Sequence, residues 1–371
     1  MRDGAPEIAI DARMAGHSGI GVYIRNIVPR LARLRPHWRF TLLGVPDDLL
    51  PVFSGDNVSI LPCRAAIYSL SEQWALARAA RHADLFWAPH YNAPLLRRGP
   101  MLVTIHDVNH LALDHGWGIR RLYATVLLQA LRRRASGLCF ASRFSRSEFE
   151  RLVGRFRQPF WLTPGAVGDA WRSARSPPRA RSARDYVVAV GSVKPHKNLT
   201  GLLDAFALIA PRFDVDLVIV GRHDGLRDSD DTALARIAEQ AGRVRLAGAL
   251  PDAALIDIVA GARALVFPSL YEGFGLPPLE AMAVGCPTVV SAIAPLTETC
   301  GVASEYVDPR DPHDMARGIA AVLGDDTRAA ELRRHGHDQV RAFDWSRTAA
   351  TVAEAMETIM APTSRDRRSM P

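Results

Sequence analysis

Two glutamates in the second half of the chain have a type and spacing that suit sugar chemistry. Glu272 falls in a glycine-containing loop, and Glu280 falls about one turn into a helix that Pro277 or Pro278 is expected to start. Carboxylates from a loop and from a helix can point into one cleft and accept hydrogen bonds from several hydroxyl groups. Free N–H groups at the helix start would face an anion. The same spacing is also typical of a solvated loop and an exposed helix face.

Two lysines stand out because this chain otherwise uses arginine. Lys194 and Lys197 are the only lysines among 46 basic residues. They lie in the stretch VGSVKPHKNL, residues 190–199, which predicts a strand end, a glycine turn and a helix start near Asn198. Compact ammonium charges beside a helix N-terminus would bind a diphosphate. Two exposed lysines in a surface turn are the alternative.

A histidine and an aspartate end a predicted strand in the first half. His106 and Asp107 close the run TIHDV, residues 104–108. We expect His106 to face a cleft and Asp107 either to orient it or to cap the next element. A purely structural histidine would give the same pattern.

A glycine turn precedes the first predicted helix. Gly16, Gly19 and Gly21 depart from the Gly-x-Gly-x-x-Gly spacing, and no acidic residue ends the second predicted strand. Both departures argue against a standard dinucleotide site. The turn would still let a phosphate or a sugar approach the helix that follows.

Strand and helix patterns alternate along the chain, which predicts parallel sheets covered on both faces. A segment rich in Ser, Pro and Arg interrupts the alternation and predicts a linker. We therefore expect an α/β protein of two doubly wound, Rossmann-like domains facing a central cleft. The expected strands are 7–11, 40–44, 85–88, 101–105, 137–141, 186–190, 216–220, 265–267 and 288–290, and the expected helices are 20–34, 70–82, 119–134, 143–153 and 199–210. The expected parts are a first domain (1–170), a linker (171–185), a second domain (186–342), a C-terminal helix crossing back to the first domain (343–360) and a flexible tail (361–371).

Composition narrows the class of protein. The chain has 371 residues, 48% hydrophobic and 23% charged, which is a globular composition. The four scattered cysteines favour a reduced, cytoplasmic protein over a zinc or disulfide framework. We expect no signal peptide and no membrane-spanning helix.

The net charge of +7 is uneven. Residues 1–170 hold 22 arginines and 13 carboxylates, whereas residues 171–371 hold 24 basic and 26 acidic residues. A basic first domain fits an anionic substrate or the anionic inner face of a membrane. The segment IRRLYATVLLQALRRR, 119–134, could lie on that membrane, although a core helix capped by cations fits it as well. The arginines show no aromatic interleaving, so we expect no nucleic acid partner.

Taken together, these stretches resemble the retaining GT-B glycosyltransferases of family 4, from about residue 7 to residue 360. Glu272 and Glu280 match that family's E-x7-E motif, within FPSLYEGFGLPPLEAMAVGCPTVVS. The run VGSVKPHKN is similar to its phosphate-binding turn, DARMAGHSGIGVYIRN to its glycine-rich loop and TIHD to its active-site histidine segment. VRLAGALPDAAL resembles the stretch whose backbone contacts the nucleobase.

The resemblance implies a role for each matching residue. Lys197 would bind the donor diphosphate, Glu280 the ribose hydroxyls, and Glu272 the sugar and phosphate; His106 would contact the donor sugar near the reacting carbon. His106, Glu272 and Lys197 are therefore the catalytic candidates. Many members carry an arginine where this chain has Ser192, so the second phosphate contact is left open between Lys194 and Arg222. The donor-binding candidates are Gly19, Gly21, Gly191, Ser192, Lys194, Lys197, Arg222, Leu246, Ala249, Glu272, Gly273, Phe274, Gly275, Leu276 and Glu280, and the acceptor-binding candidates are Asp107, Tyr91 and Arg143.

The resemblance also implies the chemistry. Negative charge builds on the leaving diphosphate as the anomeric bond breaks, and fixed cations and N–H groups stabilise it most in the transition state. We expect no metal and no other cofactor, with the leaving phosphate deprotonating the acceptor in a front-side, retaining reaction. The likeness is to bacterial mannosyltransferases that build O-antigens and exopolysaccharides from GDP-mannose on polyprenyl-diphosphate-linked glycans. A UDP-sugar donor, a sugar-nucleotide epimerase and a noncatalytic sugar-nucleotide-binding protein remain the alternatives.

Overall fold

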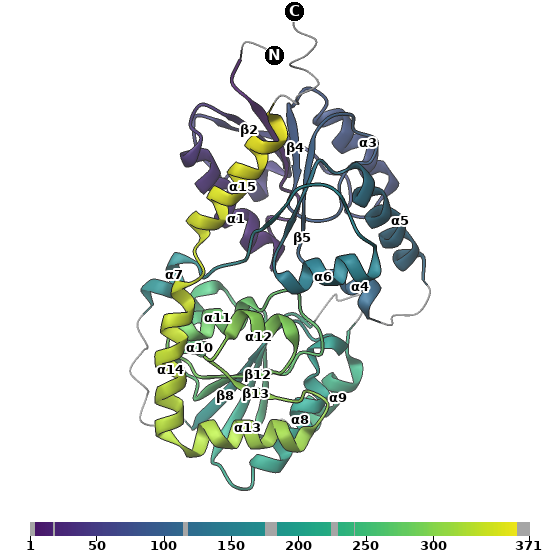
Figure 1. Ribbon diagram of the computed structural model, residues 1–371. Helices are drawn as coiled ribbons and strands as arrows, with labels where there is room; N and C mark the ends of the chain where they lie inside the picture. The colour runs from purple at the N-terminus through teal and green to yellow at the C-terminus, as the bar shows by residue number, and fades with distance from the viewer. Residues whose placement is uncertain are drawn as a thin grey trace, which may run out of the picture. The chain divides into compact units, whose positions relative to one another are not determined.

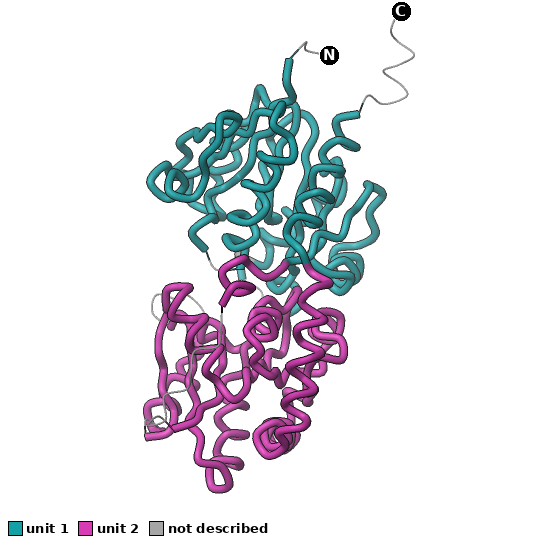
Figure 2. The backbone as a smooth tube through the Cα atoms, turned by 90° about the vertical axis from the view of Figure 1, so that its left-hand side faces the viewer, with its two compact units in different colours: residues 1–165, 344–371 teal, residues 166–343 magenta. Residues whose placement is uncertain are grey.

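The computed structural model describes residues 4–17, 19–113, 118–174, 184–223, 229–240 and 242–361. The chain divides into two compact units, coloured separately in Figure 2. Unit 1 comprises Met1–Gly165 and Asp344–Pro371, and unit 2 comprises Ala166–Phe343. Each unit is an α/β layer structure around one parallel sheet, which confirms the fold class expected from the sequence.

Unit 1 is built on a sheet that has seven strands among the described residues, in the order β3-β2-β1-β4-β5-β6-β7. Every neighbouring pair is parallel, and β1 pairs with both β2 and β4, so the chain winds outward from β1 in two directions. The strands are β1 (Glu7–Asp11), β2 (Arg39–Gly44), β3 (Val58–Pro62), β4 (Leu85–Ala88), β5 (Met101–Ile105), β6 (Gly137–Phe140) and β7 (Phe160–Leu162).

Helices cover this sheet, and the last helix of the chain is one of them. Figure 1 shows α15 beside α1, and the Tyr23 and Trp345 rings meet edge to face at 5.7 Å between these two helices. Thr348 on α15 also donates a hydrogen bond to the carbonyl of Pro164 at 2.9 Å. The helices are α1 (Ile20–Leu34), α2 (Pro46–Leu49), α3 (Leu70–Ala79), α4 (Asn109–Ala112), α5 (Ile119–Arg134), α6 (Arg143–Leu152) and α15 (Trp345–Met360).

Unit 2 repeats the plan with six strands among the described residues, in the order β10-β9-β8-β11-β12-β13, again all parallel. The strands are β8 (Asp185–Val190), β9 (Val215–Val220), β10 (Val244–Gly248), β11 (Ala264–Phe267), β12 (Thr288–Ser291) and β13 (Glu305–Val307). The helices are α7 (Asp169–Ser173), α8 (Leu199–Ile209), α9 (Asp231–Glu239), α10 (Asp252–Gly261), α11 (Leu276–Ala283), α12 (Ala294–Cys300), α13 (Pro312–Gly324) and α14 (Asp326–Arg341), with a 3-10 turn, η1, at Pro195–Lys197.

The unit boundaries differ from those expected. Unit 2 begins at Ala166, not after a linker at 171–185, because Val167 and Trp171 are buried in its core and α7 belongs to it. Residues 175–183 of the expected linker lie outside the described residues, as do 362–371 of the expected tail. The helix at the C-terminus belongs to unit 1, the unit to which the sequence analysis assigned it.

Candidate active site

Two residues that the sequence analysis assigned to donor binding are in direct contact in unit 2. The Nζ atom of Lys197 lies 2.5 Å from Oε1 of Glu272. Lys197 ends the turn after β8, and Glu272 follows β11. Because β8 and β11 are paired parallel neighbours, the loops at their carboxyl ends meet at one edge of the sheet. The two side chains are 17% and 15% exposed, so the pair lies below the surface but within reach of a ligand.

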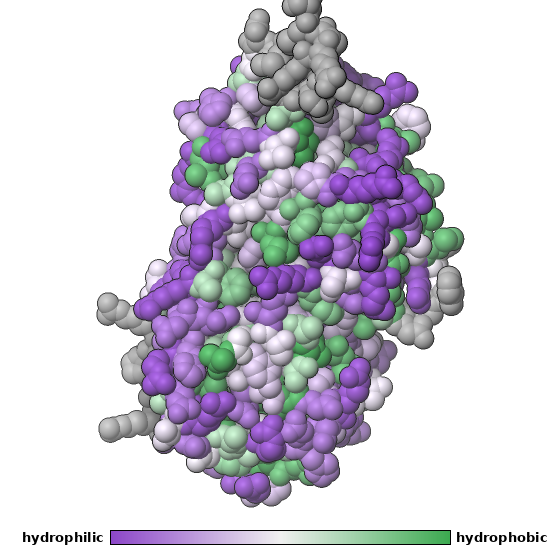
Figure 3. Space-filling view, viewed as in Figure 1, coloured by the Kyte–Doolittle hydropathy of each residue, from purple (hydrophilic) through white to green (hydrophobic). Residues whose placement is uncertain are grey.

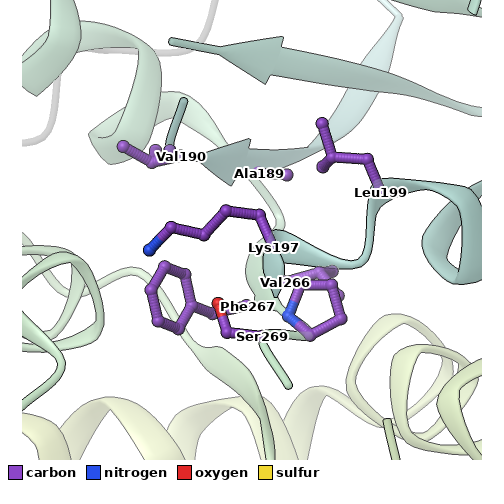
Figure 4. Close-up of a pocket in the computed structure, with 9 residues that line it drawn as sticks. Ala189, Val190, Lys197, Leu199, Val266, Phe267 and Ser269 are labelled. Atoms are coloured by element: carbon purple, nitrogen blue, oxygen red, sulfur yellow. The ribbon is translucent and has the colours of Figure 1, made fainter. Parts of the chain in front are cut away.

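The Lys197 side chain lies in a small pocket between these strand ends, and Figure 4 shows it running past the Phe267 ring. Its ammonium lies 5.2 Å from the centre of that ring, a cation–π distance. A Cβ atom on Gly191 would lie 3.5 Å from the Lys197 methylene groups, which is an ordinary van der Waals contact, so the lysine stem packs directly against this turn. The pocket is lined by Ala189, Val190, Gly191, Lys197, Leu199, Val266, Phe267, Pro268 and Ser269.

Backbone contacts bind the ends of β8, β9 and β10 together beside this pocket. The N–H of Gly191 donates to the carbonyl of Val220 at 2.9 Å, and the N–H of Gly221 donates to the carbonyl of Gly248 at 2.9 Å. A Cβ atom on Gly221 would lie only 1.9 Å from the Gly191 carbonyl oxygen. No side chain fits there, so glycine at 221 is required to bring the turns together.

Asn198 positions Lys197. It has a left-handed backbone (φ 56°), which asparagine tolerates better than most residues. Its side-chain amide donates to the carbonyls of Pro268 at 3.2 Å and Pro309 at 2.6 Å. These bonds hold the lysine turn against the loops that follow β11 and β13.

The start of α11 presents backbone donors. Gly275 precedes the helix with φ 116°, and a Cβ atom there would lie 2.6 Å from the Leu296 side chain. Among the described residues, no acceptor is found for the backbone N–H groups of Phe274, Gly275 or Leu276. The two prolines that follow carry no N–H. The N-terminus of α11 therefore offers three backbone donors to an anion.

Glu280 lies within α11 and has an unusual proton affinity. Burial, with a smaller contribution from the Asp252 carboxylate, raises the pKa of Glu280 to about 8. The described residues give its carboxyl group no hydrogen bond and no ion pair, and it takes no part in the Lys197–Glu272 contact. A carboxyl group in this state can accept hydrogen bonds from a ligand once it loses its proton.

The remaining donor candidates in unit 2 fall at the same edge of the sheet. Ser192 and Lys194 lie half-buried in the turn after β8, and the Val193 N–H donates to the Arg222 carbonyl at 3.0 Å. The Arg222 side chain and Ala249 are exposed, and Gly273 is buried between β11 and α11. The Leu246 side chain packs against the core of unit 2, so only its backbone is left for the expected contact with a nucleobase, which stays a prediction.

In unit 1, His106 follows β5 and is held in one orientation. Its Nε2 atom lies 2.8 Å from the Pro89 carbonyl oxygen, which can only accept, so Nε2 carries the proton. Burial lowers the pKa of His106, so the ring is neutral and Nδ1 keeps its lone pair. The Tyr23 ring meets the imidazole edge to face at 4.9 Å. This histidine can donate no proton from Nδ1, but it can accept a hydrogen bond there.

The three acceptor candidates lie at the carboxyl edge of the same sheet. Asp107 accepts a hydrogen bond from the Asn109 N–H at 3.0 Å, and Tyr91 follows β4. Arg143 is exposed at the start of α6. Ser145 on α6 donates to the carbonyl of His106 at 2.6 Å. That bond brings the first turn of α6 beside the histidine segment.

The two candidate glycines of unit 1 have different roles. Gly19 precedes α1 with φ 68°, a conformation that requires glycine, and open space surrounds its Cβ position. Gly21 instead packs against its own loop, because a Cβ atom there would lie 2.5 Å from the Ala15 carbonyl oxygen. Close loop packing therefore accounts for glycine at position 21, and its expected role beside a phosphate stays a prediction.

Comparison with known proteins identifies the family. Residues 172–339 match the family described as glycosyl transferases group 1. Over 278 residues the chain is 30% identical to O-antigen chain mannosyltransferase B of Escherichia coli, covering 71% of this chain and 70% of that protein. The chain belongs to the group 1 glycosyltransferases. The matches give no support to the epimerase alternative.

Solved structures place this glycosyltransferase in the GT-B fold. Sucrose-phosphate synthase from Thermosynechococcus elongatus matches with a TM-score of 0.77 at 19% identity, covering 96% of this chain and 99% of that chain. Anabaena Alr3699/HepE in complex with UDP-glucose matches with a TM-score of 0.75 at 18% identity, covering 95% and 99%. These likenesses confirm the expected fold.

Two further observations concern the described part of this glycosyltransferase. None of its helices there is both long and apolar enough to cross a membrane. Within the same residues, no three histidine, cysteine, aspartate or glutamate side chains gather in a group that could hold a metal ion.

Sequence reasoning missed two residues that build the site of this glycosyltransferase. Gly221 was not singled out, although a glycine directly after a buried strand is a signal of close backbone approach. Asn198 was used only to mark a helix start. An asparagine before a helix is a typical left-handed or capping residue, which was the available signal.

Proposed function

We propose that this glycosyltransferase moves mannose from GDP-mannose to a glycan or a polyprenyl-diphosphate-linked glycan during synthesis of a bacterial cell-surface polysaccharide. The Lys197–Glu272 contact carries the proposal. Together with the backbone N–H groups at the start of α11, it gathers a cation, a carboxylate and hydrogen-bond donors at one edge of the sheet. The relative from E. coli, an O-antigen chain mannosyltransferase, supports mannose as the sugar. A UDP-sugar donor is the alternative, since Alr3699/HepE is solved with UDP-glucose.

In this proposal the diphosphate binds at the ends of β8 and β11. Lys197 neutralises it, and the N–H groups of Phe274, Gly275 and Leu276 point at the charge that develops on the leaving group. Lys194 and Arg222 lie on neighbouring turns, and one of them supplies the second phosphate contact, since Ser192 stands where many family members carry an arginine. Fixed donors of this kind stabilise the transition state because they need no reorganisation during the reaction.

The two glutamates bind different parts of the donor, the ribose and the transferred sugar. Glu280 accepts hydrogen bonds from the ribose hydroxyls, a role that suits a carboxyl group without a partner among the described residues. When the donor binds, the ion pair between Glu272 and Lys197 loosens, and the Glu272 carboxylate accepts hydrogen bonds from the sugar. The exposed stretch after β10, with Ala249, lies beside the nucleobase.

We propose a retaining, front-side reaction that needs no divalent metal. The bond between the anomeric carbon and the diphosphate oxygen breaks, and the electron pair leaves with the diphosphate. The acceptor hydroxyl attacks the same face and gives its proton to the leaving phosphate oxygen. His106 contacts the donor sugar near the reacting carbon through its Nδ1 lone pair, which accepts a hydrogen bond from a sugar hydroxyl. Activity that survives EDTA supports this route.

We propose peripheral contact of unit 1 with the anionic inner face of the cytoplasmic membrane. Figure 3 shows hydrophobic side chains along the edge of unit 1 where Figure 1 labels α3 and α5. Leu70 and Trp74 on α3 are 80% and 73% exposed, and Leu122 and Val126 on α5 are 62% and 58% exposed. Arg78 lies in the last turn of α3, and Arg132, Arg133 and Arg134 lie in the last turn of α5; these cations complement anionic lipid.

A thermal-shift screen tests the donor. GDP-, UDP- and ADP-sugars are added to the wild-type protein and to Glu280→Ala. We expect the largest rise in Tm with GDP-mannose and its loss in the variant. A protein that no sugar nucleotide stabilises would contradict the proposed donor site.

Liposome flotation tests the membrane contact. We expect binding to vesicles that contain anionic lipid, and its loss in the double variant Trp74→Ser, Leu122→Ser. Val302→Ser is the matched control, because Val302 is 74% exposed but lies in unit 2. Equal binding to vesicles with and without anionic lipid would refute the proposed contact.

A further inference from the structure

Four aromatic rings gather on unit 1 near the segment that carries His106. The Tyr68 ring lies 6.2 Å from the Tyr91 ring and 6.3 Å from both His110 and Tyr123, measured between ring centres. Tyr91 also meets His110 at 6.2 Å. The four come from the loop between β3 and α3, the loop after β4, α4 and α5. We call these four residues the aromatic cluster.

Tyr68 is the exposed member of the aromatic cluster and has a strained backbone. It is 46% exposed, with φ 64°, a left-handed conformation unfavourable for a bulky residue. Such a strained backbone is unfavourable and is found mostly at functional sites. Among the described residues, the only other non-glycine residue with a positive φ is Asn198, which positions Lys197.

A polar rim accompanies the rings. The Tyr91 hydroxyl donates to the Tyr68 hydroxyl at 3.4 Å, and one oxygen of Asp107 accepts from the Asn109 N–H at 3.0 Å. Burial is the main cause that raises the pKa of Tyr68 and of Tyr91, and the Asp107 charge raises both further. Asp107 lies three residues before His110, in the segment between β5 and α4. The rim thus combines hydroxyls with an anionic acceptor.

The base of the aromatic cluster is fixed by a buried polar network. The Tyr123 hydroxyl lies 3.0 Å from both Glu72 Oε1 and Asn92 Oδ1. Arg13 bonds to Glu72 at 3.0 Å and to Asp11 at 2.7 Å, and both carboxylates are fully buried. Burial alone would raise the pKa of Asp11, but Arg13 and His90 hold it well below its usual range. A network this rigid holds the rings ready for a ligand.

We propose that Tyr68, Tyr91, His110 and Asp107 bind the terminal pyranose of the acceptor glycan, and that this sugar is neutral. The inference rests on the proposed function, since it assigns the acceptor side of that reaction. One apolar face of the pyranose stacks on the exposed Tyr68 ring. Its hydroxyls donate to Asp107 and exchange hydrogen bonds with the two tyrosine hydroxyls. An anionic sugar is disfavoured because the Asp107 carboxylate would repel it.

The test compares two substitutions at one position. Tyr68→Phe keeps the ring, whereas Tyr68→Asn removes it with a residue that tolerates the left-handed backbone. Saturation-transfer NMR measures binding of mannotriose, a neutral oligosaccharide, to the full-length proteins, with Asp107→Asn as a third variant. We expect Tyr68→Phe to bind more weakly than the wild type but more tightly than Tyr68→Asn, because it keeps the stacking ring and loses only the hydroxyl. We expect Tyr68→Asn and Asp107→Asn to bind about tenfold more weakly, the effect of losing one ring contact or one hydrogen bond to a charged group.

The donor-binding assay separates this inference from the proposed function. Tyr68→Asn should keep the full rise in Tm with GDP-mannose, because the aromatic cluster does not bind the donor. The acceptor site alone is overturned if the donor response is normal but the wild type does not bind mannotriose. The same holds if the wild type and Tyr68→Asn bind mannotriose equally well. If no sugar nucleotide stabilises the wild type while mannotriose binding depends on Tyr68, the sugar site stands and the proposed donor fails.

Discussion

Lys197 and Glu272 are 75 residues apart and form a 2.5 Å ion pair at the carboxyl edge of the second sheet. Each is joined to the site by its own strand, β8 for the lysine and β11 for the glutamate. A donor diphosphate would compete with the carboxylate for the ammonium group. The pair therefore holds the cation in place and poised for an anion.

Substitution of Lys197 should strongly reduce turnover. We expect Lys197→Ala to lower kcat/KM by about 10²–10³, the usual effect of removing one fixed transition-state donor. Lys194→Ala is the matched control, because it is the only other lysine and lies three residues away; we expect a loss below about tenfold. Steady-state kinetics with the donor varied measures both. Equal losses would contradict the special role of Lys197.

Nucleotide binding should release a proton from Glu280. With its pKa raised to about 8, the carboxyl group is mostly protonated in the free protein at pH 7. Ribose hydroxyls donate best to the ionised form, so we expect affinity to rise with pH between about 6 and 8. Calorimetry in two buffers of different ionisation enthalpy measures the proton, and Glu280→Gln should release none. Proton uptake by the wild type would contradict the assignment.

The same carboxyl group should make the stability of the free protein depend on pH. Since the folded protein holds this proton more tightly than the unfolded chain, its contribution is full below the ordinary pKa of 4.5 and is lost as pH rises to about 8. The free energy of unfolding should fall by at most about 1.4 kcal/mol per pH unit from this group. Urea unfolding at several pH values should show a shallower fall for Glu280→Gln. An identical pH profile would refute the shifted pKa.

Gly221 should tolerate no side chain. A methyl group there meets the Gly191 carbonyl oxygen at 1.9 Å, so we expect Gly221→Ala to lower the free energy of unfolding by about 2–4 kcal/mol. Gly168→Ala is the control, because its Cβ position is open and its φ is −68°. We expect a change of at most about 0.5 kcal/mol there. A stable Gly221→Ala protein with normal donor binding would show that the turns can separate freely.

The tautomer of His106 can be measured. Because Nε2 donates to the Pro89 carbonyl and burial lowers the pKa of the ring, we expect nitrogen NMR shifts of a neutral, Nε2-protonated imidazole at pH 7. His106→Ala should lower kcat at least about tenfold while the donor-induced rise in Tm is kept. Unchanged kcat in this variant would remove the residue from the reaction.

The strands predicted from the sequence were those in the middle of the sheets. The strands that escaped prediction, β3, β7, β10 and β13, are the outer strands of the two sheets. Central strands such as β4 and β11 are buried at every position, which gives a continuous apolar run. Edge strands such as β3 are partly exposed, so their apolar signal is weaker.

The site shows a similar division. Charged residues such as Lys197 and Glu272 could be singled out by type and spacing, because a cation and a carboxylate in glycine-containing turns are typical of an anion or sugar site. Gly221 and Asn198 act through backbone approach and a left-handed conformation, which depend on the strands that come together around them. The strain at Tyr68 was equally invisible, since nothing in its sequence neighbours demands φ 64°.

One measurement tests the central claim, that the edge of unit 2 binds a nucleotide sugar for transfer. Purified protein is given GDP-mannose labelled in the sugar and a polyprenyl-diphosphate-linked glycan, and the label in the glycan is counted with and without EDTA. We predict transfer that survives EDTA and is nearly abolished in Lys197→Ala but not in Lys194→Ala. Equal transfer by Lys197→Ala and the wild type would contradict the account. The account would also be contradicted if the wild type transferred no sugar from GDP-mannose or from any UDP-sugar.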